Sequence, residues 1–413
     1  MNAASPATRV RPPRVLSIDL LRGADVLLML FVNEVAGVTG APASLLHKPS
    51  DVDGMTITDL VFPAFLFIVG IAVPFALGSR RRRGQSRAAV LRHVVTRALA
   101  LVVMGVLMVN AEHGVDGVLS APVWNVLMTL GVLLAWGAPD EGWGRIRRPW
   151  LRGAGVALLL LVALSYRNPE ASGWIQLRPY WWGILGLIGW AYLGVAALYL
   201  LVGDRPATLA GSVALFYCVA LADAAGGIPW LRGLHPLVGP VIGTHGALVL
   251  GGALLGVLLG RHLREGGSAW RFALRVAGYA ATLGAAGFLL HSLSGLHAAF
   301  IVSKNHATVP WGLFSSALTC AAWVLLFVLA DVVGWRRWPR SLTIAGENPL
   351  IAYLMAPFLL SLFALSAPLF GGRNFYEALG QTTGIGLVRS AVFAWIVVRL
   401  SGWMRSRGVR IQL

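Results

Sequence analysis

The stretch "TDLVFPAFLFIVGIAVPFALG", residues 58–78, decides the fold class of this chain. Its only charged residue is Asp59, and the rest is almost entirely apolar or small. A run of about 18 or more nearly uncharged residues is long enough to cross the ~30 Å hydrocarbon core of a bilayer as an α-helix. The stretch therefore predicts a transmembrane helix, in which Pro63 and Pro74 predict kinks.

Similar apolar runs recur along the whole chain. Of its 413 residues, 57% are hydrophobic and 12% are charged, against about 25% charged in soluble domains. We expect an all-α polytopic membrane protein, a bundle of about 12 (10–12) transmembrane helices. They would form a single domain, residues 15–404, between short tails, 1–14 and 405–413. The expected spans lie near residues 18–37, 58–78, 94–110, 122–138, 153–166, 180–202, 207–225, 242–260, 272–291, 311–334, 344–365 and 385–403.

The net charge of +17 lies mostly in short arginine clusters between these spans, near residues 80–83, 145–152, 261–271 and 336–340. Cytoplasmic loops carry such an excess of basic residues, so we expect both termini in the cytoplasm and the loop with His47 outside. This arrangement explains the charge without a nucleic-acid partner. Only two of the 34 basic residues are lysines. Because this bias is typical of GC-rich bacterial genomes, we expect a bacterial cytoplasmic (inner) membrane protein.

The cysteines and histidines show no metal-binding spacing. Cys218 and Cys320 both lie inside apolar runs, which indicates small core residues rather than a disulfide or zinc framework. No second His or Cys stands near His47 in the sequence. We therefore expect no metal site.

The first span, "SIDLLRGADVLLMLFVNEV", carries unusual polar residues for a membrane helix. At ~100° per residue, Asp19, Arg22 and Asn33 share a sector of about 60°, running from one end of the helix to the other. Charged groups cost roughly 2.5–3.5 kcal/mol each at the centre of a span. Asp19 and Arg22 could simply form a salt bridge at the membrane surface. Asn33, further along the same stripe, indicates either a helix–helix hydrogen bond or a lined cavity.

The loop before the second span holds one histidine and two aspartates. We expect Asp51 and Asp53 to be solvated residues that shape the turn. Asp59, in the first turn of the next helix, is predicted to point into the bundle, with helix capping as the simpler alternative. A lone loop histidine is usually just exposed, so spacing by itself does not select His47.

Two later segments carry further polar residues. "IVSKNHATVPW", residues 301–311, places Lys304 beside Asn305 just before the tenth span. "GENPLIAYL", residues 346–354, predicts Asn348 as the N-cap of a helix with Pro349 at its first position. Plain helix initiation is the simpler explanation of this second segment.

Together these segments resemble the heparan-α-glucosaminide N-acetyltransferase family of transmembrane acyltransferases. The signature runs in order through "SIDLLRG", "FVN", a short outer loop with a histidine, "DGMTITDLVFPAFLFIVG", "SKNHATVPW", "DVVGW" and "GENPLIAYL". The resemblance implies acetyl transfer from cytosolic acetyl-CoA to an amino sugar on the opposite side. The family's catalytic histidine matches His47, its asparagine at the end of the first helix matches Asn33, and its aspartate in the next helix matches Asp59.

Both lines of reasoning give one hypothesis for the mechanism. The pantetheine arm of acetyl-CoA would lie along the stripe from Asp19 to Asn33, with its nucleotide near Arg22. His47 would act as general base, Asn33 would donate to the oxyanion, and Asp59 would orient the imidazole. The resemblance adds Lys304, Asn305 and Asn348 as donor-site candidates. The expected acceptor is an amino sugar or hydroxyl of an extracytoplasmic glycan, and the other expected partner is the lipid bilayer, with a homodimer left open.

Three alternatives stay open at this point. The broader class of bacterial envelope O-acyltransferases also carries an "LRG" element in the first helix, but resemblance to it predicts a histidine where Asn33 stands. A transporter or permease for a glycan or lipid-linked sugar would use Asp19, Arg22 and Asp59 as a substrate path or proton relay. A structural membrane scaffold would give the polar stripe no role.

Overall fold

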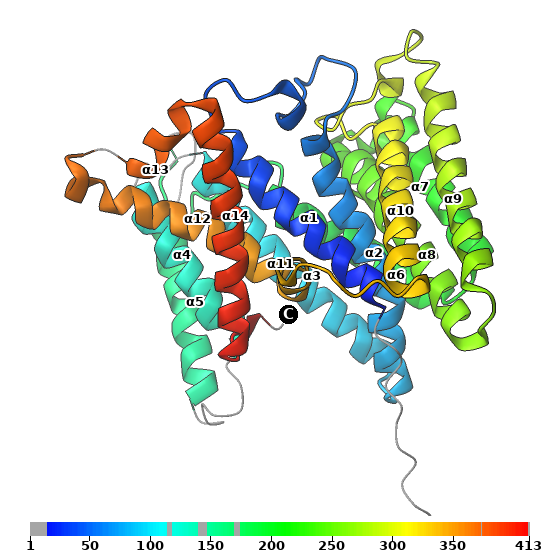
Figure 1. The fold of residues 1–413 in the computed structure, drawn as a ribbon, viewed down its shortest axis with the longest axis horizontal. Coiled ribbons are helices and arrows are strands. Elements are labelled where there is room, and N and C mark those ends of the chain that lie inside the picture. The colour runs from blue at the N-terminus through cyan, green and yellow to red at the C-terminus, as the bar shows by residue number, and fades with distance from the viewer. Residues whose placement is uncertain (1–14, 114–117, 139–146, 169–173, 373, 412–413) are drawn as a thin grey trace, which may run out of the picture.

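A computed structural model describes residues 15–113, 118–138, 147–168, 174–372 and 374–411 of the chain. These residues form a bundle of α-helices, with one two-residue antiparallel ladder between β1, Gly137–Ala138, and β2, Arg410–Ile411 (Figure 1). The predicted N-terminal tail, 1–14, lies outside the described residues. The helices are α1 Leu16–Val35, α2 Ile57–Arg82, α3 Arg87–Glu112, α4 Ala121–Trp136, α5 Arg147–Ser165, α6 Gly183–Val202, α7 Pro206–Ala224, α8 Gly246–Glu265, α9 Ala269–His291, α10 Val309–Phe327, α11 Arg340–Glu347, α12 Pro349–Ser366, α13 Phe375–Ala378 and α14 Thr383–Ser406.

The all-α polytopic membrane architecture expected from the sequence is confirmed. Nine helices within the described ranges are long and apolar enough to cross a membrane. The other predicted spans also coincide with helices. Among them, α1 carries four charged residues, and the apolar parts of α4 and α5 are shorter than 18 residues. The predicted span near 344–365 is two helices, since α11 ends at Glu347 and α12 begins at Pro349.

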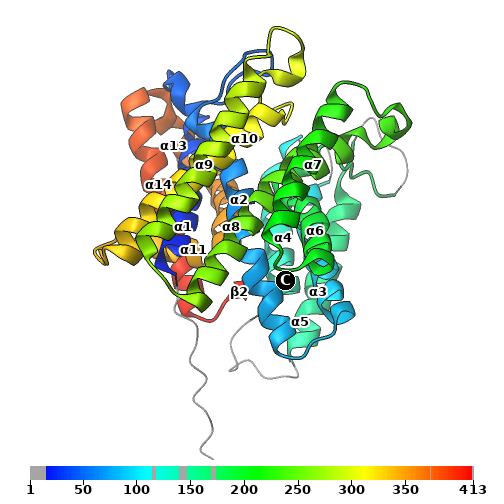
Figure 2. The ribbon, with the colours of Figure 1, turned by 90° about the vertical axis from the view of Figure 1, so that its right-hand side faces the viewer.

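The centre of the bundle depends on close contact between α2 and α8. A Cβ at Gly70 would lie 2.0 Å from the backbone oxygen of Val249, and one at Gly252 would lie 1.9 Å from that of Phe67. Small residues allow two membrane helices to approach this closely. Such close packing matters in lipid, since the hydrophobic effect does not hold the helices together there. In Figure 2, α2 and α8 lie between a group with α1, α9, α10 and α14 and a group with α3, α5, α6 and α7.

A second close contact positions α1. A Cβ at Gly23 would lie 1.8 Å from the backbone oxygen of Leu342, so α1 lies directly on α11. The first turn of α1 is capped from another helical segment, because Leu16 N and Ser17 N donate to the carboxylate of Asp331 at 3.1 and 3.0 Å. These contacts place Arg22 beside the break between α11 and α12.

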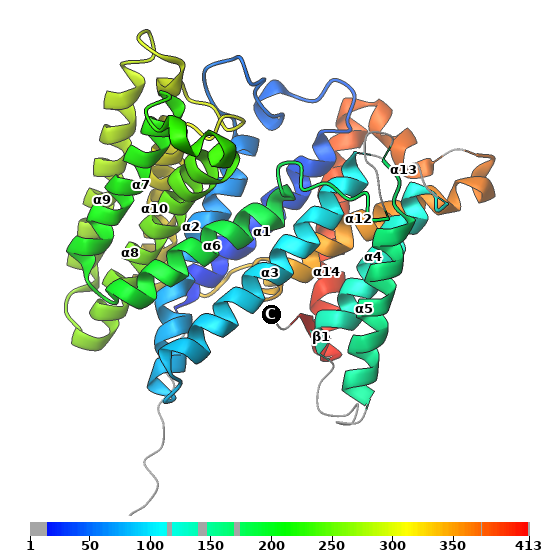
Figure 3. The same cartoon turned by 180° about the vertical axis from the view of Figure 1, so that it is seen from behind.

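The two ends of the bundle differ in composition. The α1–α2 connection, the α9–α10 connection and α13 lie at one end (Figure 1). The α2–α3 and α8–α9 turns lie at the other end, and Figure 3 shows the same separation from behind. The first end carries the loop with His47, and the second carries the arginines at 80–83 and 261–264. The residues proposed for catalysis are thus far from the basic turns.

Candidate active site

His47 and Asp59 form a hydrogen-bonded pair at the start of α2. His47 Nδ1 lies 2.7 Å from Asp59 Oδ1. The His47 side chain is 44% exposed and the Asp59 side chain 2%, so a buried carboxylate supports an accessible imidazole. Asp59 points into the bundle, as predicted.

The second oxygen of Asp59 caps the helix. Asp59 Oδ2 accepts hydrogen bonds from Thr56 N at 3.0 Å and from Lys48 N at 3.2 Å. A carboxylate at this position of the first turn satisfies a free backbone donor and interacts favourably with the helix dipole. The capping role and the partnership with His47 were alternatives from the sequence, but the structure contains both, one oxygen for each.

The backbone before His47 is tied to the first turn of α2. Thr56 Oγ1 donates to Leu46 O, and Thr58 Oγ1 donates to Leu45 O, both at 2.8 Å. These two bonds fix the loop at the C-terminal end of its short 3₁₀ turn, Ala43–Leu45. His47 is therefore positioned by backbone contacts as well as by Asp59.

Lys304 lies against the same imidazole. Its Nζ is 3.2 Å from His47 Nδ1 and 3.1 Å from Nε2. When Nδ1–H donates to Asp59, Nε2 is left as the acceptor for the Lys304 ammonium. Burial lowers the pKa of Lys304, while the Asp59 carboxylate acts in the opposite direction. Neighbouring Asn305 contacts the loop backbone instead, with Nδ2 3.5 Å from Lys48 O.

A cavity of about 720 Å³ begins at this group and extends along the bundle. It is lined by residues of α1, α2, α3, α6 and α12, with His47, Lys304 and Asn33 at one end. Arg22 also lines it, so the stripe predicted on α1 faces this cavity. Between Arg22 and Asn33 the helix rises about 16 Å, at ~1.5 Å per residue. The cavity therefore connects two depths of the membrane.

Arg97 of α3 also lines the cavity, and the sequence analysis missed it. Its guanidinium carbon lies 5.1 Å from the centre of the Tyr192 ring, and its Nε is buried with no hydrogen-bond partner among the described residues. Arg22 and Arg97 both lie closer to the arginine-rich end of their helices than to the His47 end. An arginine inside the predicted span 94–110 was the signal that could have identified it.

The remaining candidates lie beside the cavity. Asp19 Oδ1 is 3.8 Å from Arg22 Nη1, and Arg22 also donates to Gly346 O at 3.2 Å. Asp19 is not among the residues that line the cavity, unlike the other two members of its predicted stripe. Asp19 thus contacts Arg22, and Arg22 in turn lines the cavity.

Asn348 lies at the N-cap position of α12, with Pro349 first in the helix, as predicted. The predicted capping by its side chain is wrong, because the side chain makes no capping hydrogen bond. Its backbone, with φ −142° and ψ 55°, is not helical and separates the two helices, and its Nδ2 is buried with no partner within the described ranges. Pro349 and Leu350, which follow it, line the cavity.

Asp53 is an exposed loop residue, as expected. It also accepts hydrogen bonds from His291 Nε2 and from Val302 N, both at 2.8 Å, which the sequence did not predict. Burial alone would raise its pKa, yet these bonds and one to Gly54 N together hold the pKa of Asp53 below its ordinary value. Asp53 thus joins the α1–α2 loop to α9 and to the segment that leads to Lys304.

Comparison with known proteins adds an independent observation. A family model described as "Domain of unknown function (DUF5009)" matches residues 14–137. The human heparan-α-glucosaminide N-acetyltransferase is 34% identical over 122 residues. The resemblance to the heparan-α-glucosaminide N-acetyltransferase family is confirmed. The mouse heparan-α-glucosaminide N-acetyltransferase is 35% identical over 120 residues. These matches cover 30% and 29% of this chain and 17% of each animal protein.

Proposed function

We propose that this chain is a membrane-embedded acyltransferase that moves an acetyl group from cytosolic acetyl-CoA to an amino group or hydroxyl of a glycan on the extracytoplasmic side. The observation that carries the proposal is the single cavity that holds the His47–Asp59 pair at one end and Arg22 and Arg97 further along. Similarity to N-acetyltransferases across 29–30% of the chain supports the reaction class.

The cavity residues suit acetyl-CoA as donor. When bound, acetyl-CoA supplies an acetyl thioester. The Arg22 and Arg97 guanidiniums suit the phosphates of a nucleotide because each offers several donors in a fixed plane. The Nε of Arg97 is buried and has no acceptor in the part of the chain that the structure describes, which favours a polar ligand, since a buried donor without an acceptor is costly. The wall between Arg22 and Asn33 is mainly apolar and suits the methylene and gem-dimethyl groups of the pantetheine arm.

Each residue at the outer end has a proposed role. Asp59 holds Nδ1–H of His47 and leaves Nε2 as the base. Nε2 accepts the proton that the acceptor nitrogen or oxygen loses while it bonds to the acetyl carbon, and returns this proton to the sulfur when the carbon–sulfur bond breaks. Asn33 donates to the carbonyl oxygen while its negative charge grows. The acceptor replaces Lys304 at Nε2, and the displaced ammonium remains near the developing charge.

The proposed orientation follows from the basic turns. The arginines at 80–83 and 261–264 lie at the end of the bundle opposite the loop with His47, and the positive-inside rule favours the cytoplasm for such turns. Both termini would then be cytoplasmic, in a bacterial inner membrane. Acetyl-CoA would enter from the arginine-rich side and the glycan from the other.

The test is transfer of radiolabelled acetyl from acetyl-CoA to glucosamine by protein in lipid nanodiscs. We expect transfer by the wild type and a loss of roughly 10²–10⁴-fold in His47→Ala, the range for a general base. His306→Ala is the matched control, because His306 is an exposed histidine of the same outer rim and does not line the cavity. Glycan flux in proteoliposomes without acetyl transfer would favour a transporter instead, and full transfer by His47→Ala would contradict the assignment.

A further inference from the structure

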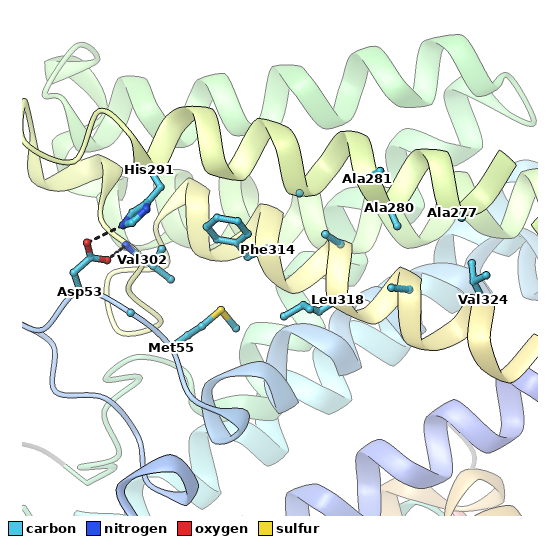
Figure 4. Close-up of a pocket in the computed structure, with 14 residues that line it drawn as sticks. Asp53, Met55, Ala277, Ala280, Ala281, His291, Val302, Phe314, Leu318 and Val324 are labelled. Atoms are coloured by element: carbon cyan, nitrogen blue, oxygen red, sulfur yellow. Dashed lines mark hydrogen bonds and ion pairs between the residues drawn. The ribbon is translucent and has the colours of Figure 1, made fainter. Parts of the chain in front are cut away.

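A second hollow lies on the outside of the bundle, between α9 and α10. It measures about 780 Å³, within the range of ~300–1,000 Å³ common for ligand sites. Figure 4 shows α9 and α10 side by side, with the small side chains of Ala277, Ala280 and Ala281 along the hollow and Asp53 and His291 at one end. Its lining is alanine, glycine and apolar side chains except at that end.

This groove lies at membrane depth. Both α9 and α10 are long and apolar enough to span a bilayer, and Leu274, Leu289 and Leu325 on the same helices are exposed. From Ala277 to His291 the helix rises about 21 Å, at ~1.5 Å per residue. That is two-thirds of the ~30 Å hydrocarbon thickness. A long apolar groove of this length matches a hydrocarbon chain that lies along the helices.

The polar end of the groove distinguishes it from a simple gap between helices. His291 Nε2 lies 2.8 Å from Asp53 Oδ2, and their side chains are 36% and 40% exposed. The His291 ring also lies edge-on to Phe314, with ring centres 6.4 Å apart. An exposed carboxylate and an exposed imidazole at the membrane rim can hydrogen-bond with the hydroxyl and amino groups of a sugar head, at the point where the hydrocarbon part ends.

The same end is directly connected to the candidate active site. Asp53 accepts from Val302 N, and two residues later Lys304 contacts His47. Two residues span at most about 7 Å of chain. In the α1–α2 connection, Met55 lines the groove, and the next residue, Thr56, donates its backbone N–H to Asp59. A head group at this end of the groove would therefore be separated from the His47 imidazole only by these short loop segments.

We propose that the groove between α9 and α10 binds the hydrocarbon chain of a lipid-linked acceptor, whose amino sugar reaches His47 along the outer rim. This inference rests on the proposed function and names the substrate class of its acceptor. The acceptor enters sideways from the outer leaflet, while acetyl-CoA uses the separate inner cavity. The continuity between groove and active site, together with the polar groups at their junction, favours a lipid with a sugar head over a second copy of the chain.

The experiment fills the groove and compares two acceptors. Ala281→Phe and Ala321→Phe place a ring in the groove from exposed positions, and Ala285→Phe and Ala322→Phe place it on exposed positions of the same helices outside the groove. The acceptors are dodecyl glucosaminide and methyl glucosaminide, with radiolabelled acetyl-CoA. We expect the groove variants to raise KM for the dodecyl acceptor about tenfold, the effect of losing roughly two buried methylene groups. KM for the methyl acceptor and for acetyl-CoA should stay unchanged, and the controls should match the wild type.

Several results would overturn the inference while the proposed function stands. The first is an equal KM for both acceptors in the wild type, and the second is an equal effect of groove and control variants. The third is that the groove variants dissociate a dimer of the protein and leave KM for the dodecyl acceptor unchanged, which would show that a second copy of the chain occupies the groove. A photoreactive dodecyl glucosaminide gives a readout that needs no transfer. Labelling of residues 277–291 and 314–324 that excess phosphatidylglycerol does not displace supports binding of the glycolipid in the groove, and transfer to the same acceptor then tests its role as substrate. Labelling elsewhere, or displacement by phosphatidylglycerol, contradicts it.

Discussion

Lys304 Nζ lies 3.1 Å from Nε2 of His47, although 257 residues separate the two in the chain. The contact brings a cation to the imidazole nitrogen that would act as base. Both His47 and Lys304 line the cavity. Burial lowers the pKa of Lys304, and the Asp59 carboxylate acts in the opposite direction. This contact gives the first prediction.

Lys304→Met should lower the maximal rate of acetyl transfer by about ten- to a hundredfold, because a charge near the developing oxyanion is lost. KM for acetyl-CoA should change little, since Lys304 lies at the opposite end of the cavity from Arg22 and Arg97. Steady-state kinetics in nanodiscs checks this. Lys48→Met, which removes the other lysine of the chain, is the control. A Lys304→Met enzyme with the wild-type rate would contradict a role at His47.

Asp59→Asn should lower the rate by roughly 10²–10⁴-fold with a modest loss of stability. An amide retains one acceptor oxygen for capping or for His47, but no longer favours one imidazole tautomer or stabilises the imidazolium. Asp59→Ala should in addition cost about 1 kcal/mol of helix stability through the lost cap. Rates and melting temperatures measured together separate the two effects. Asp51→Asn is the control, because Asp51 is exposed on the preceding loop, and it should have the wild-type rate. A wild-type rate in Asp59→Asn would argue against a catalytic His47–Asp59 pair.

Arg97→Gln and Arg22→Gln should each raise KM for acetyl-CoA about tenfold, as expected for the loss of one charged hydrogen bond. S-acetylpantetheine lacks the nucleotide, so its KM should be the same in wild type and variants. Arg92→Gln, an exposed arginine on α3 that does not line the cavity, is the matched control. If the variants raise KM for acetyl-CoA and KM for S-acetylpantetheine equally, the two arginines do not bind the nucleotide.

Asp53→Asn should change how stability depends on acid pH. The folded state holds the pKa of Asp53 below the ordinary value of 3.8. The unfolded chain therefore binds the proton more tightly, so the stabilisation by Asp53 is present above about pH 4 and is lost as pH falls through the folded pKa. Melting curves of wild type and Asp53→Asn between about pH 5 and pH 3 should converge as the pH falls. Parallel curves would show that the contacts of Asp53 do not stabilise the fold.

The sequence predicts the spans because each is a long apolar run, and it predicts the inward direction of Asp59 because that residue sits in the first turn of such a run. It predicts that Arg22 and Asn33 share a face, and both line the cavity. These features depend on local periodicity, which the sequence contains. The pairing of His47 with Asp59 is also local, since only twelve residues separate them.

The features that the sequence did not predict depend on contacts between distant segments. Asp53 is exposed as expected, but its partner His291 is 238 residues away, so spacing in the sequence could not predict this contact. Arg97 was counted as part of an apolar span, and its position facing Tyr192 depends on how α3 packs against α6. The break at Asn348 is local, since Pro349 has no N–H to continue α11, but the close approach of α11 to Gly23 depends on tertiary packing.

The most direct test of the central claim is a density map of the wild-type protein in nanodiscs with acetyl-CoA. The proposed function predicts density inside the cavity, with the nucleotide phosphates at Arg22 and Arg97 and the acetyl end between Asn33 and His47. Density for the nucleotide outside this cavity, or at the His47 end with the acetyl group directed away, would contradict it.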